Sequence, residues 1–393
     1  MGVLTIGDIG VLSGIIHIGD EAMFEAARDE LAVRGLGIVG ISSAPEESAA
    51  RYDVPCVPRL GFAGLARDAA VRRSALLTDA AAGRTRLDAG DPAQSVLDAL
   101  DESSGVLIAG GGNLASRWPV HIYERTTLAA MARARGLPVV VSGQTFGPDL
   151  EAGDAERVAA MARSALYTGV REPASATLAR GWGVRVRAGV DDASFLGQGP
   201  RSGEGPDASD RVLVSLSGWF AGRPADETER DIAVLLDRAA DTVGPVVFHA
   251  HFGPASADSE PSGDAALHER VRARMRNASE VVPSGDSVSA ARLARTSRLL
   301  VTSRYHPAVF AAPAGVPVLA LAADAYTRVK LTGALGHWGQ DAVADLDALA
   351  DAPARLAELA ASGAAVALAA AERLDDHRAD SARWWDAVAD ALC

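Results

Sequence analysis

Short apolar runs alternate with longer segments of helical period along this chain. The runs are rich in Val, Ile and Leu, and the segments between them carry mainly Ala, Leu, Arg and Glu. This alternation is typical of βα units that build a parallel sheet. We therefore expect an α/β protein.

The first half of the chain supplies one series of such units. The predicted strands cover residues 3–6, 37–41, 106–109, 138–142, 166–170 and 185–190. The predicted helices cover residues 20–34, 120–135, 155–164 and 173–181. The alternation then stops at residues 197–210, which hold Gly, Pro, Ser and charged residues without periodicity. This composition predicts a linker between domains.

A second series of units follows the linker. Its predicted strands cover residues 212–216, 245–250, 280–282, 298–302 and 317–322. Its predicted helices cover residues 227–242, 265–276, 288–296, 307–314 and 326–335. The rest of the chain is predicted to be helical from about residue 345, with a break near residues 362–363.

These patterns predict two doubly wound, Rossmann-like domains, residues 1–196 and residues 211–393, joined by the linker 197–210. We expect the domains to face one another across a cleft, with the C-terminal helices crossing back to the first domain. The length of 393 residues agrees with this division, since a domain averages roughly 150 residues.

Composition narrows the class of partner. The hydrophobic fraction of 48% and the charged fraction of 23% are ordinary for a folded globular protein. The net charge of −13 argues against a nucleic-acid or anionic-membrane partner, because phosphate binding needs a basic surface. An anionic substrate would therefore need a few well-placed basic side chains.

Cysteine usage and hydropathy suggest a cytoplasmic protein. Cys56 and Cys393 are too few for a disulfide framework or a thiolate zinc site. No basic region precedes an apolar stretch near the first residue, so we expect no signal peptide. The longest apolar run, residues 310–323, contains Pro313 and Pro317 and is too short to span a bilayer.

Ligands of open α/β sheets bind outside the carboxyl ends of the strands, where three loops of this chain stand out. The first, residues 7–20, is rich in glycine and leads to Asp20 at the predicted start of a helix. Asp20 either contacts a ligand or caps that helix. Both interpretations fit the sequence.

The second loop contains Gly111, Gly112 and Asn113 directly after a predicted buried strand. Consecutive glycines at such a place favour a tight turn whose backbone lines a binding cleft. Their spacing does not match a dinucleotide fingerprint. A phosphate-binding Walker motif is excluded because Lys330 is the only lysine in the chain.

The third loop carries the most chemistry. Ser303 is placed to cap a helix that Pro307 helps to start, and this holds Arg304 and His306 at the carboxyl end of a strand. Tyr305 lies between them. A guanidinium, an imidazole and free backbone N–H groups at one place suit a phosphate or a carboxylate.

Five further residues have two interpretations each. Arg171 precedes another helix that begins with proline, and it is either a second anion clamp or a surface ion pair. His249 and His251 end a predicted strand and either line the cleft or pack in the core. Asp191–Asp192 either orient an anion clamp or cap a turn.

Several of these segments also match a family in order and spacing. The chain reads GDEA at residues 19–22, AGGGN at 109–113, SGQTFGP at 142–148, VRE at 170–172, VDDASFL at 190–196 and SRYHPAVFAAPAGVPVLAL at 303–321. Asp324 and Lys330 follow the last motif. In this arrangement the sequence resembles the polysaccharide pyruvyltransferase family over nearly the whole chain. The residues His17–Ile18 depart from the Asn that is common before the first motif.

The resemblance implies a fold similar to the glycosyltransferase GT-B type and a role in polysaccharide biosynthesis. It implies transfer of the pyruvyl group of phosphoenolpyruvate to sugar hydroxyls, usually as a cyclic ketal, with release of phosphate. The acceptor would be a sugar or glycoconjugate, free or lipid-linked, bound by the first domain. Phosphoenolpyruvate would bind to the second domain, where Arg304 and His306 fall on donor-site positions, with Arg171 as a further donor residue.

This chemistry suits the residue types. Phosphoenolpyruvate carries a phosphate and a carboxylate, which arginine side chains bind well. His306 could protonate the terminal enol carbon or assist phosphate departure, because imidazole titrates near neutrality. Ser303, Tyr305, Lys330 and Asp20 complete the expected substrate contacts. The reaction requires no metal and no other cofactor.

Two other functions fit the same architecture. One is a glycosyltransferase that uses a nucleotide sugar, whose diphosphate Arg304 and His306 could also bind. The other is a binding protein that retains the fold without catalysis. Stabilisation by a nucleotide diphosphate, or donor binding without phosphate release, would distinguish them.

Overall fold

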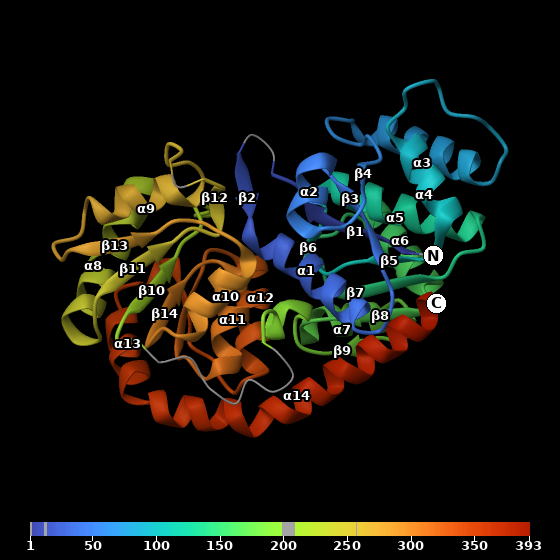
Figure 1. Ribbon diagram of the computed structural model, residues 1–393. Coiled ribbons are helices and arrows are strands. Elements are labelled where there is room, and N and C mark those ends of the chain that lie inside the picture. The colour runs from blue at the N-terminus through green and yellow to red at the C-terminus, as the bar shows by residue number, and fades with distance from the viewer. Residues whose placement is uncertain (1, 12–13, 199–208, 257) are drawn as a thin grey trace. The chain divides into compact units, whose positions relative to one another are not determined.

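Two parallel sheets carry the fold of the computed structural model, which describes residues 2–11, 14–198, 209–256 and 258–393 (Figure 1). The chain divides into two units. Unit 1 comprises Met1–Val11, Met23–Asp192 and Ala379–Cys393, and unit 2 comprises Leu12–Ala22 and Ala193–Arg378. Most of the linker 197–210 lies outside the described residues.

Unit 1 contains an eight-stranded parallel sheet with the order β4-β3-β1-β5-β7-β8-β9, in which β6 also pairs with β7. Its strands are β1 (Gly2–Ile9), β3 (Ile38–Ser42), β4 (Cys56–Pro58), β5 (Ser103–Ile108), β6 (Gly111–Leu114), β7 (Val139–Phe146), β8 (Tyr167–Val170) and β9 (Arg187–Ala188). Its helices are α2 (Pro45–Tyr52), α3 (Arg67–Ala81), α4 (Ala93–Glu102), α5 (Pro119–Ala134), α6 (Ala152–Ser164) and α7 (Pro173–Gly181).

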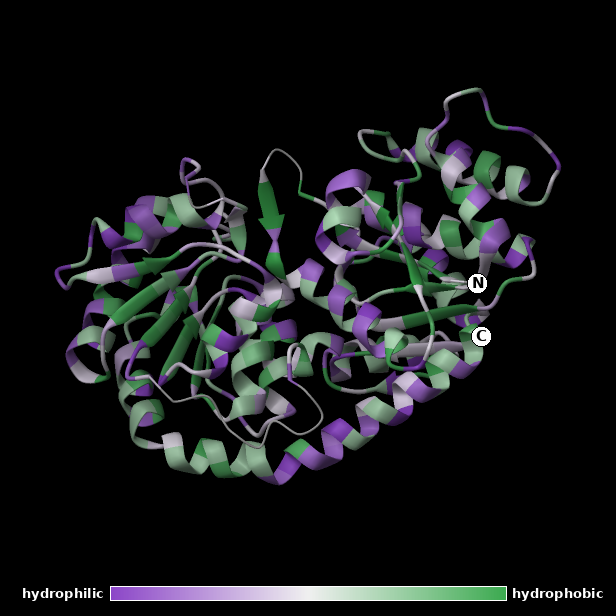
Figure 2. Ribbon diagram, in the orientation of Figure 1, coloured by the Kyte–Doolittle hydropathy of each residue, from purple (hydrophilic) through white to green (hydrophobic). Residues whose placement is uncertain are grey.

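Alternate residues of the unit 1 strands point to opposite faces of the sheet, and both faces are buried. Val106 and Ile108 of β5 point into a cluster with helices α3 to α7. Leu107 between them points into a second cluster, formed with Phe24 of α1 (Ile18–Ala32) and Trp385 of α14 (Gly363–Leu392). A parallel sheet covered on both faces needs apolar residues at every strand position, which is the pattern in the sequence. Figure 2 shows these strands as hydrophobic.

Unit 2 contains a six-stranded parallel sheet with the order β13-β11-β10-β14-β15-β16 and a two-stranded antiparallel pair, β12-β2. Its strands are β2 (Ile15–His17), β10 (Val212–Ser215), β11 (Val246–His249), β12 (Phe252–Pro254), β13 (Ser279–Val282), β14 (Leu299–Thr302), β15 (Val318–Ala322) and β16 (Val343–Asp345). Its helices are α8 (Ala225–Thr242), α9 (Asp264–Arg272), α10 (Ser287–Arg295), α11 (Tyr305–Ala311), α12 (Ala325–Gly336) and α13 (Ala352–Ala361).

Three local predictions are corrected by the structure. Helix α1 begins at Ile18, so Asp20 lies in its first turn and is not its cap. Strand β9 covers only Arg187–Ala188 of the predicted residues 185–190. Residues 14–22, expected in the first domain, group with unit 2 because β2 pairs with β12, where His17 lies opposite Phe252.

The end of the chain is helical, as the sequence predicts, and α13 and α14 are separated at Ser362. The end of α14, from Ala379 to Leu392, belongs to unit 1, where Trp384 donates a hydrogen bond to Ser142 over 2.9 Å. Among the described residues, no single helix is long and apolar enough to cross a membrane. Helices α13 and α14 pass that test only as a pair bent by 69°.

Candidate functional site

The loop after β14 is held rigidly in unit 2. Thr302, the last residue of the strand, accepts a hydrogen bond from the backbone N–H of Arg304 at 2.9 Å and donates one to the carbonyl of Ser215 at 2.8 Å. Ser303 accepts a hydrogen bond from the backbone N–H of Ser217 at 2.7 Å. Arg304, not Ser303, is the N-cap residue of α11, so the capping role expected for Ser303 is wrong.

The Arg304 guanidinium points at a buried carboxylate. Its Nε lies 2.8 Å from one oxygen of Asp264, and its Nη2 donates to the other. Burial raises the pKa of Asp264, although Arg304 opposes that rise. The guanidinium also lies over the ring of Phe252, 5.7 Å from its centroid. These contacts fix the direction of the guanidinium, whose side chain remains 27% exposed.

His306 packs directly against the start of α1. A methyl group added to Gly19 would overlap Nδ1 of the imidazole. The ring also lies against Tyr305 and Phe310, with centroids 5.1 and 6.1 Å away. Glycine at position 19 therefore allows the backbone of α1 to reach the imidazole. This contact joins the early GDEA motif to the later SRYH motif.

Asp20 lies beside several cationic or titratable groups. Burial alone would raise its pKa, but a hydrogen bond from His17 and the charges of His17, His306 and Lys330 hold it well below its usual range. The His17 Nδ1 is 3.5 Å from the carboxylate. Asp20 therefore remains ionised at neutral pH and favours positive charge around it.

Lys330, the only lysine, also lies in this part of unit 2. Its Nζ is 3.1 Å from the hydroxyl of Tyr326 and lies over the rings of Tyr305 and Tyr326, 5.0 and 4.8 Å from their centroids. The structure thus brings Lys330, Tyr305, His306 and Asp20 together. Arg304 and Lys330 each have a carboxylate nearby, Asp264 and Asp20 respectively.

The histidines behind this site are buried. Burial lowers the pKa of His249 to about 4 and that of His251 well below its usual value. Their ring centroids are 5.3 Å apart, and His251 lies 6.0 Å from Phe310. The backbone carbonyl of His251 accepts a hydrogen bond from Ile18 at 3.0 Å. Both side chains are therefore neutral at pH 7, so they add no positive charge to the site.

Arg171 lies in unit 1 and has no exposed surface. It donates to Asp191 at 2.7 Å and to Thr145 at 2.9 Å, and Glu172 lies 3.9 Å from its Nε. Arg171 therefore forms a buried ion pair, and the alternative expectation of a surface ion pair is wrong. It lies in unit 1, whereas Arg304 lies in unit 2. An anion-binding role of Arg171 stays a prediction.

Gly111, Gly112 and Asn113 form strand β6 and not the expected turn. Asn113 donates to Asp8 at 3.4 Å, and Asp8 is paired with Arg59 at 2.7 Å. The sequence analysis missed the rest of this polar cluster, which we call the unit 1 polar cluster. It comprises Asp8, Arg59, Asn113, His121, Glu124 and Arg125.

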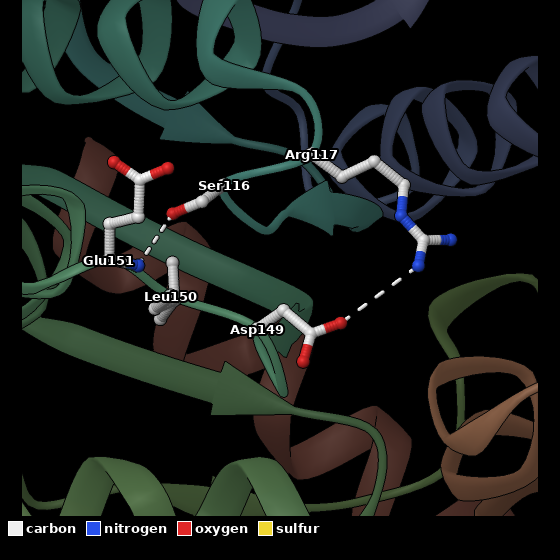
Figure 3. Close-up of a pocket in the computed structure, with 5 residues that line it drawn as sticks. All are labelled: Ser116, Arg117, Asp149, Leu150 and Glu151. Carbon is white, nitrogen blue, oxygen red and sulfur yellow. Dashed lines mark hydrogen bonds and ion pairs between the residues drawn. The ribbon is translucent and has the colours of Figure 1, made fainter.

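A pocket of about 450 Å³ opens beyond the ends of β6 and β7 in unit 1. It is lined by Ser116, Arg117, Asp149, Leu150 and Glu151 (Figure 3). Ser116 accepts a hydrogen bond from the backbone of Glu151 at 2.7 Å, and Arg117 lies 3.9 Å from Asp149. Among the described residues, no group of three or more His, Cys, Asp or Glu side chains is arranged to hold a metal ion.

Residues 17–324 match the sequence profile of a family described as polysaccharide pyruvyl transferase. The chain belongs to this family. The match starts at His17 and ends at Asp324, so it includes both the β2–α1 segment and the loop after β14. The resemblance drawn from the motifs is confirmed. No match is found among curated proteins.

Solved structures of other enzymes share the fold of this pyruvyl transferase family member. The glycotransferase of kitacinnamycin is 14% identical, with a TM-score of 0.57 over 100% of this chain and 99% of its own. The UDP-GlcNAc 2-epimerase from Neisseria meningitidis is 9% identical, with a TM-score of 0.58 over 94% of each chain. The calicheamicin glycosyltransferase CalG4 is 17% identical, with a TM-score of 0.53 over 100% of this chain and 98% of its own. These similarities confirm a two-domain Rossmann-like fold of the GT-B type.

The VDDASFL motif of this pyruvyl transferase contains two buried carboxyl groups with different environments. Asp191 pairs with Arg171, as described above. Asp192 accepts a hydrogen bond from Ser142 at 2.7 Å. Burial and the neighbouring charge of Asp191 raise the pKa of Asp192 to about 7. The folded protein therefore holds a proton on Asp192 at pH values where the unfolded chain has lost it.

This shift predicts a pH-dependent effect of Asp192→Asn. Because the pKa is higher in the folded state, Asp192 lowers the stability progressively as the pH rises from about 4 to about 7. Asparagine cannot ionise, so the variant should match the wild type near pH 4 and be more stable near pH 8, by up to about 4 kcal/mol. Denaturant unfolding at both pH values measures the difference. An equal change in stability at pH 4 and pH 8 would contradict the prediction.

Proposed function

We propose that this pyruvyl transferase uses phosphoenolpyruvate as donor and transfers its pyruvyl group to hydroxyls of a saccharide acceptor, with release of phosphate. One observation supports the proposal: unit 2 holds Lys330 and His306 beside the first turn of α1, with Arg304 two residues before His306, in a chain whose net charge is −13. A small, multiply charged anion suits such a group of basic side chains.

The anionic groups of the donor would be bound by Arg304 and Lys330. A guanidinium can donate two parallel hydrogen bonds to a phosphate or a carboxylate, whereas an ammonium acts as a compact point charge with three donors. Because Asp264 holds Nε and Nη2 of Arg304, the donor would take the remaining edge of the guanidinium. Asp20 would then balance the charge of Lys330.

His306 is the group we assign to proton transfer. In this scheme the terminal enol carbon receives a proton, which leaves cationic character on the adjacent carbon. An acceptor hydroxyl adds to that carbon and loses its proton, phosphate departs, and a second hydroxyl closes a cyclic ketal. One hydroxyl proton ends on the new methyl group and the other on phosphate, so the reaction balances without a metal or another cofactor.

Two further features belong to the proposal. The acceptor is a sugar or glycoconjugate, free or lipid-linked, and the reaction takes place in the cytoplasm. Cys56 and Cys393 form no disulfide within the described residues, which fits a reducing compartment. Neither feature affects the donor chemistry.

The decisive experiment measures phosphate release from phosphoenolpyruvate with a panel of saccharide acceptors and identifies the products by mass spectrometry. We expect phosphate release to require an acceptor and a pyruvylated saccharide to accumulate. Stabilisation by a nucleoside diphosphate, with none by phosphoenolpyruvate, would instead support a glycosyltransferase. Donor binding without phosphate release would indicate a non-catalytic protein.

The shape of the guanidinium predicts that Arg304→Lys will be nearly as harmful as Arg304→Ala. Each variant should weaken phosphoenolpyruvate binding by about 10- to 100-fold, because a charge-assisted hydrogen bond contributes roughly 1.5–3 kcal/mol. Isothermal titration with phosphoenolpyruvate measures this loss.

Arg223→Lys is the matched control for this series, since Arg223 makes a similar two-pronged contact with Asp347 elsewhere in unit 2. The control should bind phosphoenolpyruvate normally. Wild-type affinity in Arg304→Lys would show that position 304 supplies charge alone.

A further inference from the structure

The unit 1 polar cluster is built at the carboxyl ends of strands. Asp8 belongs to the end of β1 and Asn113 to β6, and both face helix α5, which carries His121 and Glu124. Arg59 joins them, with its Nε 3.0 Å from the buried carboxylate of Glu124. This end of a parallel sheet is where α/β proteins bind their ligands.

The proton positions in the cluster follow from its contacts. The guanidinium groups of Arg59 and Arg125 lie 3.3 and 3.2 Å from Nδ1 of His121. Because both can only donate, Nδ1 must accept, and the proton of a neutral ring lies on Nε2. That nitrogen is 3.6 Å from Asp8. His121 thus faces the Asp8 carboxylate, whose side chain remains 24% exposed.

Two amide groups, that of Asn113 in the unit 1 polar cluster and that of Gln144, have their oxygens close to Gly111. Asn113 uses its nitrogen for Asp8, so its Oδ1 faces away from that carboxylate. Gln144 uses its nitrogen for the carbonyl of Ala109, so its Oε1 faces the opposite way. Both oxygens approach Gly111, where a side-chain carbon would lie 3.1 Å from Oδ1 and 3.5 Å from Oε1.

Neither amide oxygen has a hydrogen-bond partner within the described part of the chain. Asn113 is 9% exposed and Gln144 is fully buried. A buried acceptor without a donor is costly, so a donor from outside the chain, a bound molecule or an ordered water, is expected at these oxygens. The pairing of β6 with β7, which sets Gly111 opposite Gln144, brings the two oxygens together.

The chemistry of the cluster selects the class of ligand. Two amide oxygens and the Asp8 carboxylate are acceptors, so the ligand must donate hydrogen bonds. An anion would be repelled by Asp8, and a cation would be disfavoured by Arg59 and Arg125 alongside. A neutral compound with neighbouring hydroxyl groups meets both conditions. Saccharides are such compounds.

The pocket shown in Figure 3 lies at the ends of the same two strands. Ser116 and Arg117 follow β6, and Asp149 to Glu151 follow β7. Its volume of about 450 Å³ falls in the range of small-molecule sites.

We infer that unit 1 binds the saccharide acceptor through hydroxyl groups that donate to Asn113 Oδ1, Gln144 Oε1 and Asp8. The identification of this saccharide as the acceptor rests on the proposed function. The binding site itself rests on the paired amide oxygens. It also gives a function to Asp8, Arg59 and His121, which the sequence motifs did not identify.

Saturation-transfer NMR with the full chain tests the site without any donor. The probes are the methyl glycosides of glucose, galactose and mannose. We expect at least one to bind the wild type, and Asn113→Ala and Gln144→Leu each to weaken its binding at least tenfold. Asn277→Ala is the control, because Asn277 is an amide in unit 2 with its own partners, Asp237 and Asp241.

Melting temperature with and without phosphoenolpyruvate provides the second readout. Both unit 1 variants should remain folded and retain the donor-induced shift of the wild type. Unchanged glycoside binding in both variants, or no binding of any probe by the wild type, would overturn the inference. A third outcome separates the two proposals. If a glycoside binds through Asn113 but phosphoenolpyruvate does not stabilise the protein, the saccharide site is supported and the proposed donor is rejected.

Discussion

Replacing His306 with alanine should lower the rate of pyruvyl transfer by about 10²- to 10⁴-fold, the range typical of a general acid or base. The affinity for phosphoenolpyruvate should change much less, because Arg304 and Lys330 supply the charges that bind the donor. His306→Gln should not restore the rate, since an amide can donate a hydrogen bond but does not give up a proton at neutral pH.

Turnover and donor affinity must be measured separately to test this assignment. Single-turnover phosphate release gives the rate, and calorimetric titration gives the affinity for phosphoenolpyruvate. His377→Gln is a suitable control, because His377 is another half-buried histidine of unit 2, placed 2.9 Å from the carbonyl of His337. Equal losses of rate and affinity in His306→Ala would make His306 a binding residue and reject its role in proton transfer.

The sequence predicts the regular βα alternation well because each unit carries a local signal. Helix α7 covers Pro173–Gly181, the bounds predicted from its initial proline and final glycine. The break between α13 and α14 falls where Ser362–Gly363 interrupt the helical pattern. Helices α2, α3 and α4 were missed. In α3, Leu76 is exposed beside the buried Leu77, which weakens the periodicity on which the prediction depends.

Long-range pairing explains what the sequence could not predict about the site. The strand β2 is only three residues long, and its pairing with β12 joins segments more than 200 positions apart. No local pattern indicates that this pairing carries Gly19 and Asp20 to His306. The family resemblance placed both motifs in a shared function, but only the structure shows the contact between them.

Arg171 and Arg304 illustrate a second limit. Each lies between a strand and a helix with an early proline, so anion binding is expected of both, with a surface ion pair as the alternative for Arg171. The parallel pairing of β8 with β9 sets Gly169 opposite Arg187, and the chain that follows β9 brings Asp191 to Arg171. Arg171 is fully buried beside Asp191, whereas the side chain of Arg304, which also pairs with a buried carboxylate, remains 27% exposed.

The contact between Gly19 and His306 predicts a second large effect. In Gly19→Ala the added methyl group would overlap the imidazole Nδ1, so either the ring or the first turn of α1 must move. Displacement of a catalytic group by about 1 Å can cost roughly 100-fold in rate, and we expect a loss of at least that size. Overpacking should also destabilise the protein by about 1–3 kcal/mol.

Gly336→Ala is the matched control, because Gly336 is also in unit 2 and has open space where its side chain would lie. It should retain the wild-type rate. A normal rate in Gly19→Ala would show that the imidazole tolerates displacement and that the contact has no part in catalysis.

The double variant Gly19→Ala, His306→Ala separates positioning from a general loss of structure. If Gly19 acts through the imidazole, removing the ring also removes the overlap. The double variant should then be no slower than His306→Ala and should melt at a higher temperature than Gly19→Ala. Such non-additivity is expected only for side chains that interact directly. A double variant much slower than either single variant would mean that Gly19 serves the reaction independently of His306, through the backbone of α1 itself.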